Sequence, residues 1–538
     1  MVPLLIVNNL IFNDFSLAVD NKINDPKLNL NNLDLITQNT SALPLANTIE
    51  VKGNTIFQSE INNIIEPLQN KDITSDQLNE VTEAITSLYL NRGYLTSRAF
   101  VETVGEDKKA LIIVAEGEIQ KVEIEGANRL EKYILDRIAL GAKTPFNSGK
   151  LEDQLRLLKN DPLLENIEAT IRSGDSERQS ILAVKVTEAN PVFGSFGIDN
   201  YSPPSVGATR VNLSLGHGNV FGLGDSFAVS YSPRIEGSAG TYDYSVNYSV
   251  PVNAMNGTVN LGAVFQENKV VEGIFAPLDI RGESQFYQIN YRQPLIRNPR
   301  QEFALSLGMT YRTGQTFTFQ GPTPFGIGPD ANGISKTNVI NFGQDYTLRD
   351  SNGAWAFRSQ FNLGVGLFDV TNATQENAPD GYFFSWLGQV QRVQALGENH
   401  LLIIQADLQL TGDPLLPSEQ FAIGGGQSLR GYRQNARSGD NGFRFSVEDR
   451  ITLSRDADER PVFQLAPFFD MGSAWNVDKN PNFSPSQTFL TSLGLGLIWQ
   501  PTKQIDMRLD YAPPLVNLDD RGGNIQDDGL HFNLKYNF

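Results

Sequence analysis

The last nine residues of the chain, "LHFNLKYNF" from Leu530 to Phe538, alternate strictly between apolar and polar side chains. Successive side chains of a β-strand point to opposite faces, so this stretch predicts a strand with one apolar and one polar face. The apolar face carries Phe532, Tyr536 and the terminal Phe538, whereas His531 lies on the polar face. A soluble edge strand with such an aromatic face would invite aggregation, so we expect this face to be covered or to contact lipid.

Alternation of the same kind fills the chain from Pro191 onward, in about sixteen segments of roughly 10 to 15 residues separated by turn residues. In 242–250 and 505–511, tyrosines and aliphatic residues alternate with polar or charged ones. A membrane-barrel strand needs only about 10 residues, because lipid-facing and lumen-facing side chains alternate along it. An arginine that faced the lipid would cost about 2–4 kcal/mol at mid-bilayer. Arg358 and Arg508 both fall on the polar side of their segments.

The connections between these segments are alternately short (253–257, 298–300) and long (318–333, 412–441). Barrels of outer membranes have short periplasmic turns and long external loops. We therefore expect a mainly β fold, in which residues 190–538 form an antiparallel transmembrane β-barrel of about sixteen strands. The alternation alone would also fit a large soluble all-β protein, whose apolar side chains point inward.

Composition excludes several classes of function. No run of about 18 apolar residues occurs, so no transmembrane helix is expected. The chain has no cysteine, and His217, His400 and His531 lie far apart, so neither a metal site nor another cofactor is expected. Neither a phosphate-binding loop nor a G-x-S-x-G nucleophile motif occurs, and we expect no enzyme. The net charge of −18 argues against nucleic acid as a partner.

A repeat lies ahead of the predicted barrel. "IEVKGN" (Ile49–Asn54) returns as "VEIEGAN" (Val122–Asn128) with the two glycines 73 residues apart. In each copy a strand leads to the glycine, two stretches with apolar residues at helical spacing follow, and two strands complete the unit. We expect two β-α-α-β-β units, at 46–118 and 119–189. The Asn-rich segment 1–45 is expected to be a degenerate signal, a plug helix or a linker.

The predicted loop after residue 411 carries an arginine between bulky apolar groups, in the sequence Leu429-Arg430-Gly431-Tyr432. A loop of about 30 residues inside a compact domain is more often functional or disordered than idle. If it folds into the barrel, its guanidinium needs a carboxylate, because a charge taken out of water must be paired.

The segment "PVFQLAPFFDMGSAW" (461–475) supplies that carboxylate. Its alternation places Phe468, Asp470 and Gly472 on the lumen face. We expect Arg430 and Asp470 to form a bidentate pair, with Gly472 leaving room for the loop. Glu448, in the preceding strand, is also expected to point inward. The alternative is a solvated loop arginine and a general charge network in the lumen.

Taken together, these features resemble the BamA/TpsB superfamily of outer-membrane protein transporters, and most closely the two-partner-secretion (TpsB) proteins of the FhaC/ShlB/HecB type. Two tandem units of the POTRA (polypeptide-transport-associated) kind precede a barrel. Leu429-Arg430-Gly431-Tyr432 matches the [VL]-R-G-[FY] loop motif of this superfamily, and Phe468-x-Asp470-x-Gly472 matches its F-x-D-x-G strand motif. The C-terminal aromatic strand, with Phe532, Tyr536 and Phe538, resembles the signal by which such barrels are recognised for assembly.

The resemblance implies a protein-secretion pore in the outer membrane of a Gram-negative-type bacterium, with its POTRA units in the periplasm. The partners it implies are an unfolded client of the large TpsA exoprotein kind, outer-membrane lipid and the barrel-assembly machinery. Capture of the client is expected by strand addition to the edge "LTSRAFVE" and by an apolar groove on the helix at 74–91. The residues expected to bind the client are Leu78, Val81, Ile85, Leu95, Ala99 and Val101.

Two other functions fit parts of the sequence. A BamA-like insertase would assemble other barrels, and its loss would deplete many unrelated outer-membrane proteins rather than one exported client. A passive porin would need neither the tandem repeat nor the pairing of Arg430 with Asp470.

Overall fold

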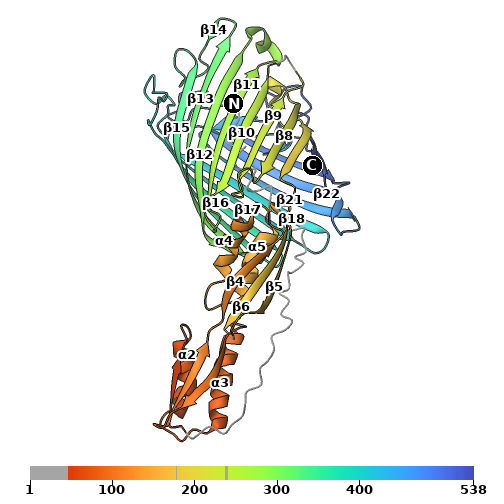
Figure 1. The fold of residues 1–538 in the computed structure, drawn as a ribbon. Helices are drawn as coiled ribbons and strands as arrows, with labels where there is room; N and C mark the ends of the chain where they lie inside the picture. Colours follow the sequence, from red (N-terminus) through yellow and green to blue (C-terminus); the bar gives the residue numbers. More distant parts are fainter. Residues whose placement is uncertain (1–45, 177, 237–239) are drawn as a thin grey trace. The chain divides into compact units, whose positions relative to one another are not determined.

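The computed structural model describes residues 46–176, 178–236 and 240–538. They form two compact units, an N-terminal unit ending at Asn190 and a β-barrel unit beginning at Pro191 (Figure 1). The segment 1–45, expected to be a degenerate signal, a plug helix or a linker, lies outside the described residues. Among the residues described, no helix is both long and apolar enough to span a membrane.

The first half of the N-terminal unit is a three-stranded sheet packed against two helices. Strand β3 is central, with β1 parallel to it on one side and β2 antiparallel on the other. Helix α3 begins after Thr74, whose side chain and that of Gln77 each accept the other's amide in a capping box. The elements are β1 (Thr48–Lys52), α2 (Gln58–Ile65), the short helix η1 (Glu66–Leu68), α3 (Ser75–Leu90), β2 (Arg98–Val104) and β3 (Lys109–Ala115).

The second half repeats this topology. Strand β6 is central, with β4 parallel and β5 antiparallel to it. The core between helices and sheet includes Ile134, Leu151 and Leu182, all fully buried. The elements are β4 (Glu118–Glu125), α4 (Glu131–Gly141), α5 (Ser148–Lys159), β5 (Leu164–Ser173) and β6 (Gln179–Glu188).

Both halves share a carboxylate that joins the end of the central strand to the start of the first helix. Glu116 follows β3 and accepts the Thr55 amide and the Tyr89 hydroxyl, each at 2.7 Å. Glu188, at the end of β6, accepts the Asn128 amide at 2.8 Å. Burial and the hydrogen bond to Glu116 both raise the pKa of Tyr89, so its hydroxyl stays a donor at neutral pH. The repeat thus preserves an interaction as well as a pattern of strands and helices.

Replacing Glu116 by glutamine should destabilise the N-terminal unit by about 1–3 kcal/mol, because the amide turns a donor toward groups that are themselves donors. Urea unfolding of a fragment comprising residues 46–190 measures this change. Glu125→Gln, at an exposed position, is the matched control and should leave the midpoint unchanged. Equal midpoints for both variants would show that the Glu116 carboxylate does not hold the unit together.

The second unit is a closed antiparallel barrel. Each strand pairs with its neighbours in the chain, and β25 pairs with β7 through residues 533–537 and 195–199, which closes the cylinder. In the described residues, sixteen strands make up the wall, and the two-residue β14 (Gly321–Pro322) extends β13. The fold expected from the alternation is therefore confirmed.

The wall strands in chain order are β7 (Val192–Asp199), β8 (Arg210–Gly218), β9 (Ser226–Pro233), β10 (Tyr242–Pro251), β11 (Thr258–Lys269), β12 (Arg281–Arg297), β13 (Gln301–Thr318), β15 (Ile334–Asp350), β16 (Gly353–Gly364), β17 (Phe384–Ala395), β18 (His400–Thr411), β21 (Asn441–Arg455), β22 (Pro461–Trp475), β23 (Phe489–Trp499), β24 (Ile505–Tyr511) and β25 (Leu530–Asn537). Between them lie the short helices η2 (Pro204–Val206) and η3 (Gly273–Leu278) and the small hairpin of β19 (Phe421–Ile423) and β20 (Arg437–Gly439).

Apolar side chains point outward from this wall and polar ones point inward. On the last strand, Tyr536 and the following Phe538 are 45% and 58% exposed, whereas His531 is fully buried. Phe532 pairs across the ladder with the outward-facing Leu509, so the residues of the assembly motif share the outer face. Short turns such as 298–300 alternate with long connections such as 412–440, which gives the barrel a short-turn end and a long-loop end.

Candidate functional site

The connection between β18 and β21, residues 412–440, is the longest between neighbouring wall strands in the described part of the chain. We call it the pore loop. It carries the small hairpin of β19 and β20, and its side chains contact lumen-facing groups of β21, β22 and β24. Leu429, Arg430 and Tyr432 are each at most 7% exposed, so the motif is packed inside the barrel.

Arg430 is bound to Asp470 of β22 by two parallel hydrogen bonds. Its Nε lies 2.7 Å from Oδ2 and its Nη2 lies 2.8 Å from Oδ1, while the Arg430 amide also donates to Oδ2 at 3.0 Å. Ser446 donates to Oδ1 at 2.6 Å. The guanidinium carbon sits 3.3 Å from the centroid of the Phe468 ring. Phe468 and Asp470, two residues apart on one strand, therefore supply a ring face and a carboxylate to the same cation.

Glu448 of β21 extends this pair into a network. It accepts from Arg430 and also from Arg508 of β24, at 2.6 Å, and from Arg450, at 2.8 Å. Arg508 in turn donates from its Nε to Asp510 at 2.7 Å. Three guanidinium groups thus meet three carboxylates on these strands and the loop, so the charges balance. Removing one member of such a buried network leaves an uncompensated charge, at a cost of about 3–5 kcal/mol.

The neighbours of Arg430 in the motif fix the backbone of the loop. Tyr432 donates from its hydroxyl to the carbonyl of Thr491 at 2.8 Å and accepts the amide of Val516 at 3.1 Å. Gly431 has φ +94°, and a Cβ there would lie 2.8 Å from the carbonyl oxygen of Ala512. Glycine is required on both counts, because other residues are strained at this φ and have no room.

Gly472 leaves room for the loop from the side of the wall. A Cβ at this position would lie 3.3 Å from Cδ1 of Leu429 and 2.7 Å from the carbonyl oxygen of Phe443. Leu429 is fully buried and packs in a small cluster with Tyr432 and Leu490. The structure therefore brings together the whole predicted set: Leu429, Arg430, Gly431, Tyr432, Phe468, Asp470, Gly472 and Glu448.

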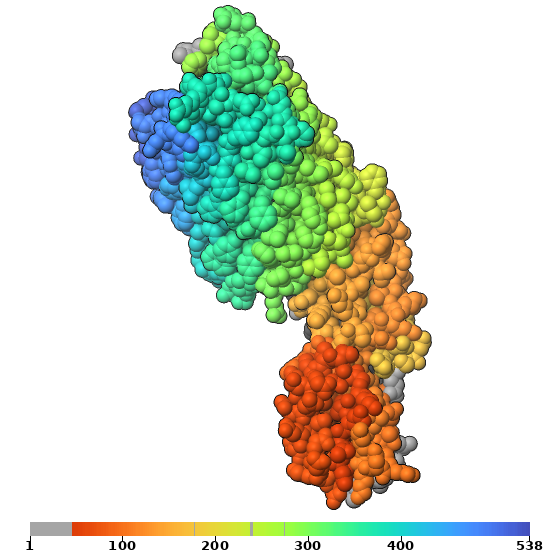
Figure 2. Space-filling view, turned by 90° about the vertical axis from the view of Figure 1, so that its left-hand side faces the viewer, coloured from red at the N-terminus to blue at the C-terminus, as the bar shows by residue number. Residues whose placement is uncertain are grey.

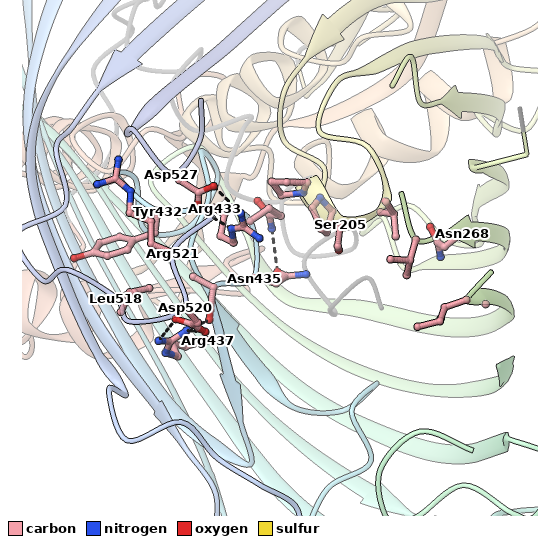
Figure 3. A pocket seen from close by; sticks show the side chains of 18 of the residues that line it. Ser205, Asn268, Tyr432, Arg433, Asn435, Arg437, Leu518, Asp520, Arg521 and Asp527 are labelled. Carbon is pink, nitrogen blue, oxygen red and sulfur yellow. Dashed lines mark hydrogen bonds and ion pairs between the residues drawn. The ribbon is translucent and has the colours of Figure 1, made fainter. Parts of the chain in front are cut away.

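Beyond Tyr432 the pore loop is held by a second group of ion pairs (Figure 3). Arg433 binds Asp527 through its Nε and Nη2, both at 2.6 Å, and reaches Glu272 at 3.1 Å. Arg437 binds Asp520 at 2.9 Å and 3.0 Å. These acids belong to the connections β11–β12 and β24–β25. A cavity of about 520 Å³ lies beside this part of the loop.

Sequence reasoning missed several members of the site. Alternation puts Arg508 and Asp510 on the polar face of their strand, but spacing alone does not show that Arg508 joins Asp510 to Glu448. Asp440, at the base of the loop, is fully buried and accepts the amides of Leu415 and Val477 at 2.9 and 3.0 Å. Its donors lie in two different loops, so no local sequence motif predicts that Asp440 belongs to the site.

The predicted client groove on α3 needs a correction. Leu78 and Ile85 are fully buried and Val81 is 3% exposed, because the helix turns this face onto its own sheet. Apolar periodicity marks the core side of a helix, so the predicted binding surface on this face is wrong. These residues cannot contact a client while the unit is folded.

The predicted edge does exist in part. Strand β2 has β3 as its neighbour on one side only within the sheet. Ala99 is buried, and its amide already donates to Thr86 of α3 at 2.9 Å. Leu95 and Val101 are half-buried, whereas Glu102 and Thr103 are exposed. The accessible part of the edge therefore begins at Val101.

The model of the family "Haemolysin secretion/activation protein ShlB/FhaC/HecB" matches residues 178–498, which is more than half of the chain. The chain belongs to this family. A second model, "POTRA domain, ShlB-type", matches residues 45–117, which identifies the first β-α-α-β-β unit as a POTRA domain. The resemblance drawn from the motifs is confirmed, and the chain is an outer-membrane barrel protein of the ShlB/FhaC/HecB family with its POTRA domain in the periplasm.

Relatives and solved structures agree with this membership. The outer membrane transporter CdiB of Escherichia coli is 25% identical over 415 residues, covering 73% of this chain and 67% of the relative. The hemolysin transporter protein ShlB of Serratia marcescens is 23% identical, covering 76% and 72%. The matches span about two thirds of the CdiB relatives' length. The solved structure of CdiB from Escherichia coli has the same fold, with a TM-score of 0.76 at 21% identity over 98% of this chain and 97% of that one.

Gly431→Ala should loosen the pore loop, because the new Cβ meets the Ala512 carbonyl and the backbone is strained at φ +94°. We expect a protease added to intact cells to cut within 412–440 several times faster than in the wild type. Gly412→Ala, in the same loop but with open space around its Cβ, is the matched control. Equal cutting of the two variants would mean that Gly431 does not hold the loop.

Proposed function

We propose that this chain secretes one partner exoprotein across the outer membrane, through the lumen that the pore loop now occupies. The observation that carries the proposal is the balanced ion network in which Arg430 holds the loop against Asp470 and Glu448. A passive pore keeps a water-filled channel open, whereas the lumen of this barrel holds a loop bound by buried ion pairs. A transporter that passes an unfolded chain needs a closed resting state and an element that can be displaced.

The first POTRA unit is the proposed site of capture. An extended segment of the client would add to the sheet at the accessible part of β2, beginning at Val101, where Glu102 and Thr103 are exposed. Strand addition takes its affinity from main-chain hydrogen bonds, so it suits a client that is unfolded when it arrives. Leu95 and Val101 would contact alternate client side chains, whereas the buried face of α3 would take no part.

For a client to pass through the lumen, Arg430 and its neighbours in the pore loop must leave their contacts with the wall or move together with Asp470 and Glu448. The guanidinium network makes this costly but not prohibitive, because arginine–carboxylate bonds can exchange among the several carboxylates within reach. Folding of the client outside the cell would drive export, since no nucleotide-binding motif occurs in the sequence. In this proposal the chain is not an enzyme. It uses the barrel-assembly machinery for its own insertion and contacts lipid with its outer face.

The BamA-like insertase is the less well supported alternative. The fold is shared, since the BamA structure from Haemophilus ducreyi matches 93% of this chain with a TM-score of 0.52 at 13% identity. The family model, however, is that of secretion and activation proteins.

Arg430→Ala tests the proposal. The barrel should still insert, while export of the client falls about tenfold or more, because Asp470 and Glu448 lose the cation that neutralises them. Arg521→Ala is the control, because its pair with Asp528 is exposed and worth little. The measurements are client in the medium and in the periplasm, together with the amounts of unrelated outer-membrane barrels. Undiminished export would remove the loop from the mechanism, and a general loss of other barrels would favour the insertase.

A further inference from the structure

Along β11 and its neighbouring strands, the side chains on the outer face of the barrel change from apolar to polar at the same height on the wall. On β11 the outward residues run Leu261, Ala263, Phe265 and then Glu267. The ladder places Glu267 opposite Glu283 of β12. It also places Glu283 opposite Gln315 of β13, so the polar level continues across three strands.

This change lies on the side of the long loops. Strand β11 runs toward its long connection, residues 270–280, and the change occurs before it ends. Strands β12 and β13 are 17 and 18 residues long, and a strand needs only about 10 to cross the bilayer. These strands therefore continue beyond the outer boundary of the membrane.

A row of aromatic rings marks that boundary. The rings of Tyr244 and Phe265 are 6.3 Å apart, those of Phe265 and Tyr287 are 5.8 Å apart, and those of Tyr287 and Tyr311 are 6.3 Å apart. Aromatic girdles of this kind sit where hydrocarbon meets the lipid headgroups. In the space-filling view the yellow-green to green part of the barrel belongs to these strands (Figure 2).

A hollow of about 560 Å³ opens in the outer face at the level of the girdle and just above it. Its aromatic part is formed by Tyr231 and Tyr242, whose rings are 5.9 Å apart, together with Tyr244 and Phe265. The Tyr242 hydroxyl donates to Glu267 at 2.7 Å. The remaining polar lining includes Glu283, Gln285, Thr313, Gln315 and Lys336, together with Gln266 and Ser284.

The chemistry of this lining selects a neutral ligand rich in hydroxyl groups. Glu267 and Glu283 oppose each other directly, which repels anions and costs energy when nothing lies between them. Lys336, the cationic side chain of this lining, is paired with Asp369. Carboxylates and carboxamides accept hydrogen bonds from hydroxyls, and tyrosine rings pack against apolar faces. A sugar ring offers both, whereas a lipid tail offers no hydrogen bonds and a phosphate carries the wrong charge.

We propose that this hollow binds the saccharide headgroup of a glycolipid in the outer leaflet. The tail of such a lipid would lie along the apolar residues below the girdle, and its sugars would reach the carboxylates above it. The site depends on the barrel's place in the outer membrane and not on secretion, so the two proposals can fail separately.

Saturation-transfer NMR on the full chain in detergent tests this, with a dephosphorylated, lipid-free oligosaccharide of the lipopolysaccharide outer core, made only of neutral hexoses, as the probe. We expect saturable binding that EDTA does not change. Glu283→Gln and Tyr231→Leu should each weaken it about three- to tenfold, the loss of one hydrogen bond or one ring contact. Glu376→Gln, in an exposed loop, and Tyr511→Leu, outward on β24, are matched controls and should bind like the wild type.

Heat-modifiable migration on gels shows that each variant is folded, and Glu283→Gln preserves size and shape if Tyr231→Leu does not fold. No binding of the dephosphorylated probe, or equal binding by Glu283→Gln and the wild type, would overturn the proposal. Binding that needs the phosphorylated probe and vanishes in EDTA would overturn it too, because it would indicate phosphate held through a bridging divalent cation.

Discussion

A guanidinium inside a barrel must be neutralised, and this requirement organises the second half of the molecule. Arg430 reaches its carboxylates only if the pore loop enters the lumen, and Asp470 and Glu448 are stable there only if cations meet them. Gly431 and Gly472 provide the space, and Leu429 and Tyr432 provide the apolar anchors. The position of a loop is therefore determined by the charges on the wall.

The N-terminal unit applies the same principle on a smaller scale. Glu116 and Glu188 are carboxylates that amides rather than cations stabilise, and each fastens a strand end to the turn before a helix. Their equivalence in the two halves shows that the repeat is structural. By contrast, the pairs of Arg433 and Arg437 connect the pore loop to acids in the long connections of the barrel. The loop is thus held both at the wall and at the level of the external loops.

The alternation of apolar and polar residues predicted most of the fold, because in a membrane barrel every second side chain of a strand contacts lipid and is apolar. It also placed Asp470 and Glu448 correctly in the lumen, since parity along a strand decides the face. Alternation along a strand tells which face a side chain is on, but not which side chains of other strands it meets. The ion pairs of Arg508 with Glu448 and Asp510 therefore became visible only in the structure. Helical periodicity misled for Leu78, Val81 and Ile85, because it marks a buried face without saying what buries it. Asp440 could not be found at all, since its donors come from separate loops.

The coupling between Arg430 and Asp470 is the most direct test of this picture. A double-mutant cycle with Arg430→Ala, Asp470→Ala and the combined variant, measured by unfolding in detergent, gives the coupling free energy. Residues joined in one buried network should be non-additive by about 1–3 kcal/mol. Additivity within about 0.5 kcal/mol would mean that the two groups do not hold the loop in the lumen.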